Sequence, residues 1–578
     1  MIYNINKFSN LKFKFRLDEQ KLYINRENPN QKKNKNYKFV SLNNEIIIMD
    51  NKTYSLDDFF KNIYNKYTKY VCLTFNEAFF ISKKNFIEFN KLFPFVSTSE
   101  FNLLEINEKY KQLIFFKENL FDVFFRTNFK SIQDQYSSYL RFKQNKKIHY
   151  KNILDHNFFF AIKSGFSDVF KLLENRPDRK IYQLDVNSMH PFAMTKENYS
   201  IPSQLKYYKN NNIENILSDK ITNGIFNCVL KIKNNLTPKA RNFVRYIPIN
   251  LIEDNTSIPI NITKNDTINI LLHANEIKFY SKYFDITLED GVYSKKSISH
   301  PLKKWILDTY DKRLQSSGIQ KDFYKFILVL SHSIILKRGL EEDFFSKNSI
   351  HYDFMQKYQY KLSENLNIAN SYINLYEYDE EIIASKSYNI NNNYNVYSLY
   401  SQVLANTRIH LLELYEKLHN SSKEFELCYC NIDSLHISIP IDKESLFKEA
   451  IKDLISPTEL GKLKIESITN RGIWFEPGRY WLFNDNQLVN FKNTIFNDDN
   501  KDYKCVFKKI EYLDKRNDYK VNYFSLFKVL QNKKLIKEVD ENHYVYYKNN
   551  NGGVSLLLNK INNLKKYKKI FKKYILKT

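Results

Sequence analysis

Cysteine, glycine and proline are all scarce in this sequence of 578 residues. Its five cysteines are few and scattered, which excludes a disulfide scaffold, and their odd number fits a reducing compartment. Ten glycines and twelve prolines exclude the collagen-like and proline-rich classes. No run of 18 apolar residues occurs, so we expect no membrane span and no membrane partner.

Basic and aromatic residues are abundant instead. The chain has 89 Lys and Arg against 64 Asp and Glu, a formal charge of +25. This excess points to a polyanionic partner, although the many Asn, Lys, Ile, Tyr and Phe residues also fit AT-rich codons. Such codon usage indicates a mitochondrial, other organellar or plasmid genome. The 16% aromatic content excludes a mainly disordered chain, and the length suggests roughly four domains or subdomains.

The periodicity of apolar residues predicts several elements. Residues 180–186 read as a buried strand, and 301–340 have helical spacing. The strongest helical pattern covers 396–419, where apolar residues recur at three and four and Gly and Pro are absent. A hairpin is predicted at 426–440, and the basic C-terminal segment ends in a helix-like stretch at 556–577.

Two aspartates stand at the ends of predicted strands. Asp185 ends the first strand, and Asp433 lies in the turn of the hairpin. Each alone is read more simply as a helix-capping or turn residue. Cys428 and Cys430 would share a strand face, but with no second cysteine pair nearby a zinc site is not expected. Together, two carboxylates on neighbouring strands can hold two divalent ions for phosphoryl transfer, and their oxygens suit Mg²⁺.

Four segments resemble motifs of family B DNA polymerases, in particular the protein-primed members of phages, linear plasmids and mitochondria. DVNSMHP (185–191) resembles the first polymerase motif, Asp-x-x-Ser-Leu-Tyr-Pro, and YCNIDS (429–434) resembles the third, Tyr-x-Asp-Thr-Asp-Ser. QVLANTRIH (402–410) is similar to the helix that precedes the third motif. KFILVLSHS (325–333), between the two acidic motifs, resembles their fingers motif.

The resemblance implies a role for each matching residue. Asp185 and Asp433 would be catalytic and would ligate two Mg²⁺ ions, with Mn²⁺ as a substitute and the Val186 carbonyl as a further ligand. The residues implied to bind the nucleotide are Ser188, Met189, His190, Lys325, Arg313 and His332. Those implied to contact primer or template are Ser164 and Gly165, from a remnant of the family's linker motif, and Arg479 and Tyr480, from its primer-strand motif. For Lys325 and Arg313 the simpler reading is solvated helix charge.

Several positions depart from the family pattern. Asn431 replaces the first Asp of the third motif, and Val329 and His332 replace the Asn and Tyr of the fingers motif. His190 replaces the Tyr that excludes ribose, which puts discrimination against ribonucleotides in doubt, and Gly478 replaces the Lys of the primer-strand motif. Segment 1–180 contains no Asp-x-Glu; only TFNEAFFI (74–81) and YKNILD (150–155) resemble exonuclease motifs, so proofreading is not expected.

The resemblance therefore predicts an α+β fold: a right-hand polymerase of palm, fingers and thumb, with a degenerate RNase H-like exonuclease domain at the N-terminus. The implied domains are an inactive exonuclease-like domain (1–160), the first part of the palm with a terminal-protein-docking-like insertion (161–300), fingers (301–340), an insertion (341–395), the second part of the palm (396–482) and a basic thumb (483–578). The implied partners are a DNA primer–template, dNTPs and a terminal protein that primes synthesis. The alternative is a catalytically decayed relative that binds nucleic acid or serves as a structural component of an organellar assembly. A structural protein that is basic only through codon bias would explain the charge but not the ordered motifs.

Overall fold

The structure is a computed structural model and mixes helices and strands in an α+β fold. It describes residues 13–17, 20–24, 37–43, 45–65, 68–74, 77, 81, 95–97, 104–124, 132–163, 165–171, 173–253, 256–260, 267–333, 342–346, 371–378, 381–388, 395–476, 478–485, 487–493, 536–537, 545–548 and 554–557. Across these residues, no helix combines the length and apolar character that a bilayer crossing requires.

The chain divides into two compact units. Unit 1 consists of Met1–Gln20, Asn152–His300 and Tyr397–Thr578, and unit 2 of Lys21–Lys151 and Pro301–Val396. The segment implied to form the fingers therefore groups with most of the N-terminal segment, while both acidic motifs belong to unit 1. The domain assignments implied by the resemblance stay predictions.

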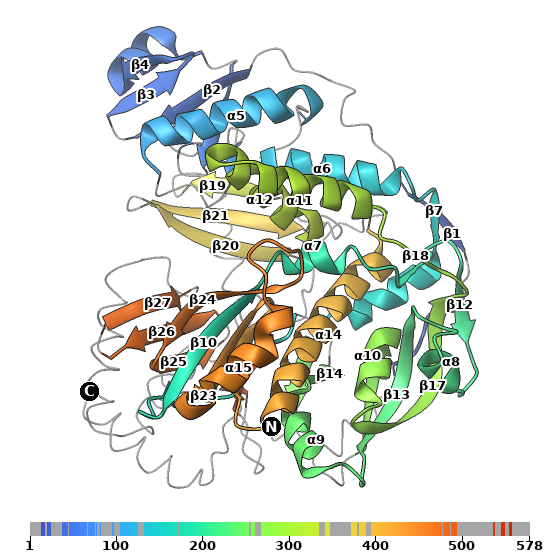
Figure 1. Ribbon diagram of the computed structural model, residues 1–578. Helices are drawn as coiled ribbons and strands as arrows, with labels where there is room; N and C mark the ends of the chain where they lie inside the picture. The colour runs from blue at the N-terminus through green and yellow to red at the C-terminus, as the bar shows by residue number, and fades with distance from the viewer. Residues whose placement is uncertain are drawn as a thin grey trace. The chain divides into compact units, whose positions relative to one another are not determined.

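The central sheet of unit 1 carries both acidic motifs. Its strands follow the order β24-β10-β23-β22-β8-β30-β29-β28, in which β8 is Ser167–Val169 and β28 is Ile536–Lys537. The central four are β24 (Leu463–Thr469), β10 (Arg179–Val186), β23 (Ser434–Pro440) and β22 (Glu426–Asn431), all antiparallel to their neighbours. The strand predicted at 180–186 and the hairpin predicted at 426–440 are confirmed as β10 and β22–β23 (Figure 1). Most side chains of β10, β22 and β23 are buried, whereas most of those of β24, at the edge of the sheet, are exposed or half-buried.

Helix α14 (Tyr397–Ser421) confirms the strongest helix prediction and is the main packing element of unit 1. Asp155 caps its N-terminus, because its carboxylate accepts hydrogen bonds from Tyr397 N (2.8 Å), Ser398 N (3.0 Å) and Ser398 Oγ (2.5 Å). Seventeen of its side chains are buried, so the helix is surrounded by protein on most sides. Near its C-terminal end α14 also packs against α15 (Glu444–Ile451), which covers one face of β23 (Figure 1).

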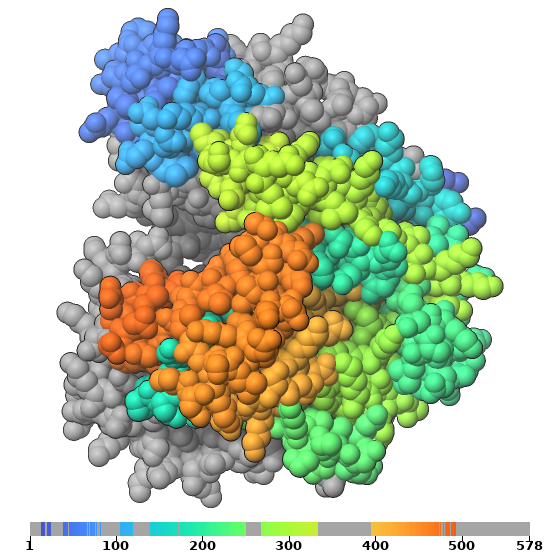
Figure 2. Space-filling view, viewed as in Figure 1, coloured from blue at the N-terminus to red at the C-terminus, as the bar shows by residue number. Residues whose placement is uncertain are grey.

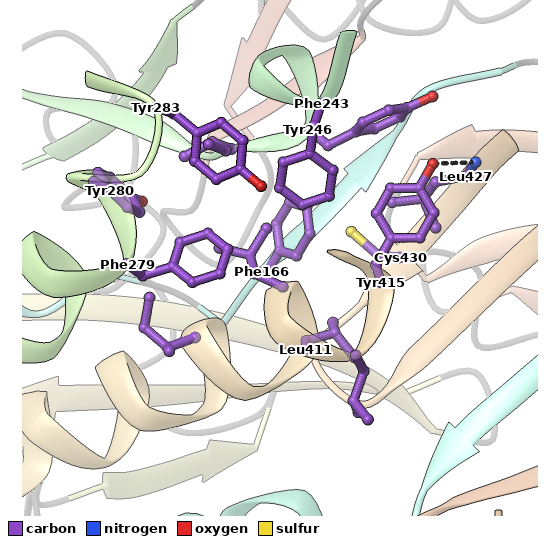
Figure 3. Close-up of a cluster of buried hydrophobic side chains, with 14 of the residues drawn as sticks. Phe166, Phe243, Tyr246, Phe279, Tyr280, Tyr283, Leu411, Tyr415, Leu427 and Cys430 are labelled. Carbon is purple, nitrogen blue, oxygen red and sulfur yellow. Dashed lines mark hydrogen bonds between the residues drawn. The ribbon is translucent and has the colours of Figure 1, made fainter. Parts of the chain in front are cut away.

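A four-stranded sheet with the order β12-β17-β13-β16 occupies residues between the two acidic motifs. Its strands are β12 (Leu205–Tyr208), β17 (Phe284–Ser294), β13 (Ile225–Ile232) and β16 (Thr267–His273), and β16 leads into α10 (Ala274–Tyr280). A cluster of aromatic rings joins this region to α14. Phe243 stacks on Tyr283 (centroids 5.1 Å apart) and on Tyr415 (5.7 Å), as Figure 3 shows. Within unit 1, the early segment (green) and the late segment (orange) form a continuous surface (Figure 2).

Unit 2 contains a five-stranded sheet and the helical pair predicted at 301–340. The sheet has the order β4-β3-β2-β5-β6, in which β2 (Tyr37–Leu42), β5 (Lys69–Thr74) and β6 (Phe95–Ser97) are parallel. Strands β3 (Ile46–Met49) and β4 (Lys52–Ser55) continue the sheet with antiparallel pairing. Helices α11 (Lys303–Gln315) and α12 (Gly318–Ser333) confirm the helical prediction. Helix α12 packs its aromatic side chains against α5 (Ile106–Phe124), where the rings of Phe326 and Phe116 lie 5.5 Å apart.

The helix-like reading of the C-terminal tail is wrong at its start. Strand β30 (Val554–Leu557) includes the first two residues of the stretch predicted at 556–577, and the remainder lies outside the described residues. The apolar run at this point satisfies strand pairing with β29 (Val545–Lys548) as well as helical spacing, and periodicity alone does not separate the two.

Candidate active site

The two predicted acidic residues come together at one end of the central sheet. Asp185 is the penultimate residue of β10 and lies opposite Ser434, the first residue of β23. Asp433 precedes Ser434 in the hairpin loop, and its carbonyl accepts a hydrogen bond of 2.7 Å from Val186 N. Residues far apart in sequence are thus held together by backbone pairing. The sequence predicted that each Asp lies at the end of a strand, and in the structure these two strand ends meet at the same edge of the sheet.

The pair is electrostatically unfavourable when both carboxylates are charged. Burial raises the pKa of Asp185 to about 7, and the negative charges of Asp433 and Glu466 act in the same direction. Burial also raises the pKa of Asp433, with a further upward contribution from Glu466, while Lys492 and Lys464 oppose the shift. An added cation would relieve this repulsion, so the site favours binding of positive charge.

Three charged neighbours of the pair were not singled out from the sequence. Lys464 Nζ lies 3.3 Å from Asp185 Oδ2 and 2.8 Å from Glu466 Oε1. Lys464 faces Asp185 directly in the register between β24 and β10. Lys492 lies on β27 (Gln487–Asn493), opposite Tyr480 of β26 (Arg479–Asn484). Its positive charge lowers the pKa of Asp433. A period-two reading of the predicted palm segment at 460–466 could have placed Lys464 on the face of Asp185.

A buried layer of aromatic and amide groups lies beside the pair. Tyr480 packs against the ring of His436 (centroids 4.6 Å apart), and its hydroxyl accepts a hydrogen bond from Gln183 Nε2 (3.1 Å). Trp474 Nε1 donates to His436 Nδ1 at 2.8 Å. Burial lowers the pKa of His436 to about 3, so this imidazole is neutral at physiological pH. These contacts fix Tyr480, predicted as a primer contact, with 6% of its surface exposed.

The turn after Asp185 leads into the short helix α7 (Met189–Ala193). Ser188 precedes it with a left-handed φ of 52°, and Asn187 anchors the turn by donating to the carbonyls of Ser456 (2.7 Å) and Glu459 (3.1 Å). The side chain of Met189 is buried, so only its backbone is placed to contact a ligand. Burial lowers the pKa of His190 to about 4 and keeps its imidazole neutral.

The other predicted site residues are placed less directly. Ser164 lies outside the described residues, as does the side chain of Arg479, whose backbone belongs to β26. Gly165 lies against Ile432 in the hairpin loop, 3.0 Å from its Cγ1 to the position that a Cβ would occupy. The remaining three belong to unit 2, where Lys325 is exposed on α12, His332 is buried on the same helix and Arg313 is half-buried on α11.

The donor set of the pair fits a cation that prefers oxygen ligands. Both side chains are carboxylates, and burial beside one another leaves their negative charge poorly compensated. Among the described residues no group of three or more His, Cys, Asp and Glu side chains is arranged to hold a metal ion. Cys428 and Cys430 are buried and form no disulfide.

No protein-family model and no curated protein matches the sequence. Among solved structures, the orthorhombic crystal form of Phi29 DNA polymerase aligns with a TM-score of 0.46 and 14% identity, over 68% of this chain and 64% of that chain. Phi29 DNA polymerase complexed with primer–template DNA and incoming nucleotide substrates gives 0.44 and 14%, over 67% and 62%. The family B DNA polymerase of the hyperthermophilic archaeon Pyrobaculum calidifontis gives 0.25 and 10%, over 77% and 45%. This chain thus spans a little under two thirds of the Phi29 polymerase, and scores of this size assign no residue a role.

Proposed function

We propose that this protein is a template-directed DNA polymerase of the protein-primed family B type, without proofreading activity. The observation that carries the proposal is the position of Asp185 at the end of β10, opposite Ser434 and within the electrostatic influence of Asp433 in the adjoining hairpin loop, with Glu466 adding further negative charge. Two carboxylates in one strand-end site suit the metal-assisted transfer of a phosphoryl group. Within that reaction class, the proposal of DNA synthesis rests on the order of the surrounding motifs, which resemble those of family B DNA polymerases.

In the proposed reaction the 3′-hydroxyl of a primer attacks the α-phosphate of a dNTP. One O–P bond forms, the bond between the α-phosphate and the pyrophosphate breaks, and the hydroxyl proton leaves to solvent. Asp185 and Asp433, with the Val186 carbonyl as a further ligand, would hold two Mg²⁺ or Mn²⁺ ions, which would neutralise the negative charge of the attacking oxygen and of the leaving pyrophosphate. The main task of the protein is then to position the primer 3′-hydroxyl against the α-phosphate of the dNTP.

The remaining roles concern substrate binding. In unit 1 the backbone of Ser188 and Met189 would hold the triphosphate and His190 would lie beside the sugar. For Lys325, Arg313 and His332, which belong to unit 2, the proposal keeps the nucleotide-binding role that the resemblance implies. Gly165, Arg479 and Tyr480 would contact primer or template. Lys464 and Lys492 add positive charge on the same side of the sheet as the acid pair, where a DNA phosphate would approach. A terminal protein docked on the insertion within 161–300 would supply the priming hydroxyl in an organellar or plasmid setting.

Primer extension tests the proposal. With a labelled primer on a short template, dNTPs and Mg²⁺ or Mn²⁺, the protein should add templated nucleotides, and Asp433→Ala should remove the activity because it removes half of the metal-binding pair. The matched control is Asp442→Ala, an exposed aspartate beyond the other end of β23, which should retain activity. No incorporation by the unmodified protein, with salt-sensitive DNA binding retained, would favour the decayed nucleic-acid-binding relative instead.

The same assay without dNTPs tests the absence of proofreading. We expect the labelled primer to keep its length, because the described acidic residues near the two exonuclease-like segments serve other purposes. Both carboxylate oxygens of buried Glu77 accept hydrogen bonds, from Ser41 Oγ (2.6 Å) and from Thr74 Oγ1 (2.9 Å). Asp155 belongs to unit 1 and caps α14. Stepwise shortening of the primer by the purified protein, unchanged by Asp433→Ala, would contradict this prediction.

A further inference from the structure

The hairpin loop that carries Asp433 has an unusual backbone. Six non-glycine residues in the described part of the chain have positive φ. Four of them are Asp or Asn, which tolerate the left-handed region because their short polar side chains bond locally. The other two, Ser188 (φ 52°) and Ile432 (φ 61°), both lie beside the acid pair. Ile432 is the one β-branched residue of the six, and such side chains are strongly disfavoured at positive φ.

Ile432 occupies the first of two loop positions in this hairpin. Asn431 pairs with Ser434, so Ile432 and Asp433 alone form the connection between β22 and β23. Two-residue hairpin loops with positive φ at the first position normally carry glycine there. Asp433 N donates to Asn431 O at 2.6 Å, which tightens the loop further. Glycine at position 432 would adopt this backbone conformation without strain, but the sequence has isoleucine there.

The surrounding structure holds Ile432 in this conformation. Its N–H donates to Phe166 O at 2.8 Å, and Ser167 Oγ donates to Asn431 Oδ1 at 2.9 Å. Its side chain fills the space over Gly165, because a Cβ added to that glycine would lie 3.0, 3.3 and 3.4 Å from Cγ1, Cγ2 and Cβ of Ile432. The segment 165–167 therefore clamps the loop from outside, and Gly165 provides the room for the isoleucine.

We propose that Ile432 is a positioning residue: packed on Gly165, its strained backbone fixes the direction of the Asp433 carboxylate toward Asp185. Strain of this kind persists when neighbouring contacts over-determine it, and it concentrates at functional sites. A glycine at 432 would relieve the strain but would also let the loop sample other conformations and turn Asp433 away. The inference rests on the proposed function, since it assumes that the pair binds divalent metal.

Binding of Mn²⁺ to the full-length protein, followed by electron paramagnetic resonance, tests the inference without requiring catalysis. We expect Ile432→Gly to weaken Mn²⁺ binding about tenfold or more, the usual consequence of losing a group that orients a ligand. Ile432→Val keeps the β-branch over Gly165 and should bind within about twofold of the unmodified protein. As a control, Asp485→Gly changes another left-handed residue, in the loop between β26 and β27, and should leave Mn²⁺ binding unchanged.

A double-variant cycle separates positioning from general damage. Gly165→Ala places a methyl group against Ile432 and should weaken Mn²⁺ binding in the unmodified background but not together with Ile432→Gly, because the contact is then absent. Additive effects, or unmodified Mn²⁺ affinity in Ile432→Gly, would overturn the inference while leaving the proposed function intact. If the unmodified protein shows no Mn²⁺ binding that depends on Asp433, the proposed function and this inference both fail.

Discussion

Replacing Asp185 by Asn should reduce primer extension by roughly 10³-fold or more and, in metal-free protein, should make the fold more stable above pH 7. The activity falls because the amide cannot supply a charged metal ligand. The stability rises because the native carboxylate is half-buried next to Asp433 and Glu466, which raises its pKa to about 7 from the ordinary 3.8. An amide of the same shape occupies the position without that charge.

The direction of the pH dependence follows from proton binding. Between about pH 4 and pH 7 the native state keeps a proton on Asp185 that the unfolded state has already lost. Native stability therefore falls as the pH rises through this window, and the full penalty is present above pH 7. With Lys464 at 3.3 Å and partial exposure of the carboxylate, we expect a penalty on the order of 2 kcal/mol.

Urea unfolding in EDTA at pH 5 and pH 8 measures this effect. Asp185→Asn should gain stability over the unmodified protein mainly at pH 8, whereas the exposed Asp442→Asn should change stability equally little at both. Added Mg²⁺ should remove the advantage of the variant, because metal binding stabilises only the protein with both carboxylates. An Asp185→Asn protein that is less stable at pH 8 without metal would show that Asp185 has a stabilising partner stronger than Lys464.

The position of the acid pair could be predicted from the sequence because strand ends and motif order are local properties. The neighbours of the pair depend on long-range register. Glu466 is two residues from Lys464 and so shares its strand face, but only the pairing of Lys464 with Asp185 brings that face of β24 to the acid pair. Lys492 is one lysine in a lysine-rich tail, and only the pairing of β27 with β26 distinguishes it from the others.

Backbone strain and burial were equally inaccessible from the sequence. The hairpin at 426–440 was predictable from its turn residues, but the positive φ of Ile432 depends on the space above Gly165. In the fingers motif Lys325 is exposed and His332 buried, a distinction set by how α12 packs against α5. In the sequence Asp155 resembles a remnant of an exonuclease motif, but in the structure its carboxylate accepts three hydrogen bonds from the start of α14.

Replacing Glu276 by Gln should destabilise the protein by about 3–5 kcal/mol, the expected cost of breaking a buried ion pair. Glu276 and Arg408 are both at most 2% exposed, and Glu276 Oε1 accepts from Arg408 Nε (2.9 Å) and Nη2 (2.7 Å). Lys163 is buried nearby, and its Nζ donates to Leu271 O at 2.6 Å. Although burial opposes it, the charges of Arg408, Lys163 and His273 lower the pKa of Glu276 to about 2. Without its charge, two buried cations would remain.

The loss in Glu276→Gln should also depend on pH. Burial lowers the pKa of Lys163 to about 8 even with Glu276 present. Removing the Glu276 carboxylate lowers the pKa of Lys163 further. As the pH rises, Lys163 in the variant therefore loses its proton, and the cost of an unpaired buried charge becomes smaller. We therefore expect the difference in unfolding free energy between the two proteins to be larger at pH 6 than at pH 9. Asp219→Asn, which removes the exposed pair with Lys278, is the control and should cost less than about 1 kcal/mol at either pH.

The double variant Glu276→Met/Arg408→Met tests whether the Glu276–Arg408 ion pair contributes only to stability or also to the position of the Asp433 loop. If the pair contributes only to stability, replacing both partners by apolar side chains should restore most of the loss, and primer extension should return with it. Arg408 Nη1 also donates to Lys163 O at 3.0 Å, in the segment that leads to Gly165 and the Asp433 loop. Methionine cannot replace that bond, and Lys163 stays buried without the carboxylate of Glu276, so we expect the double variant to recover part of the stability without recovering Mn²⁺ affinity. Full recovery of both would show that the loop is held by residues 165–167 alone.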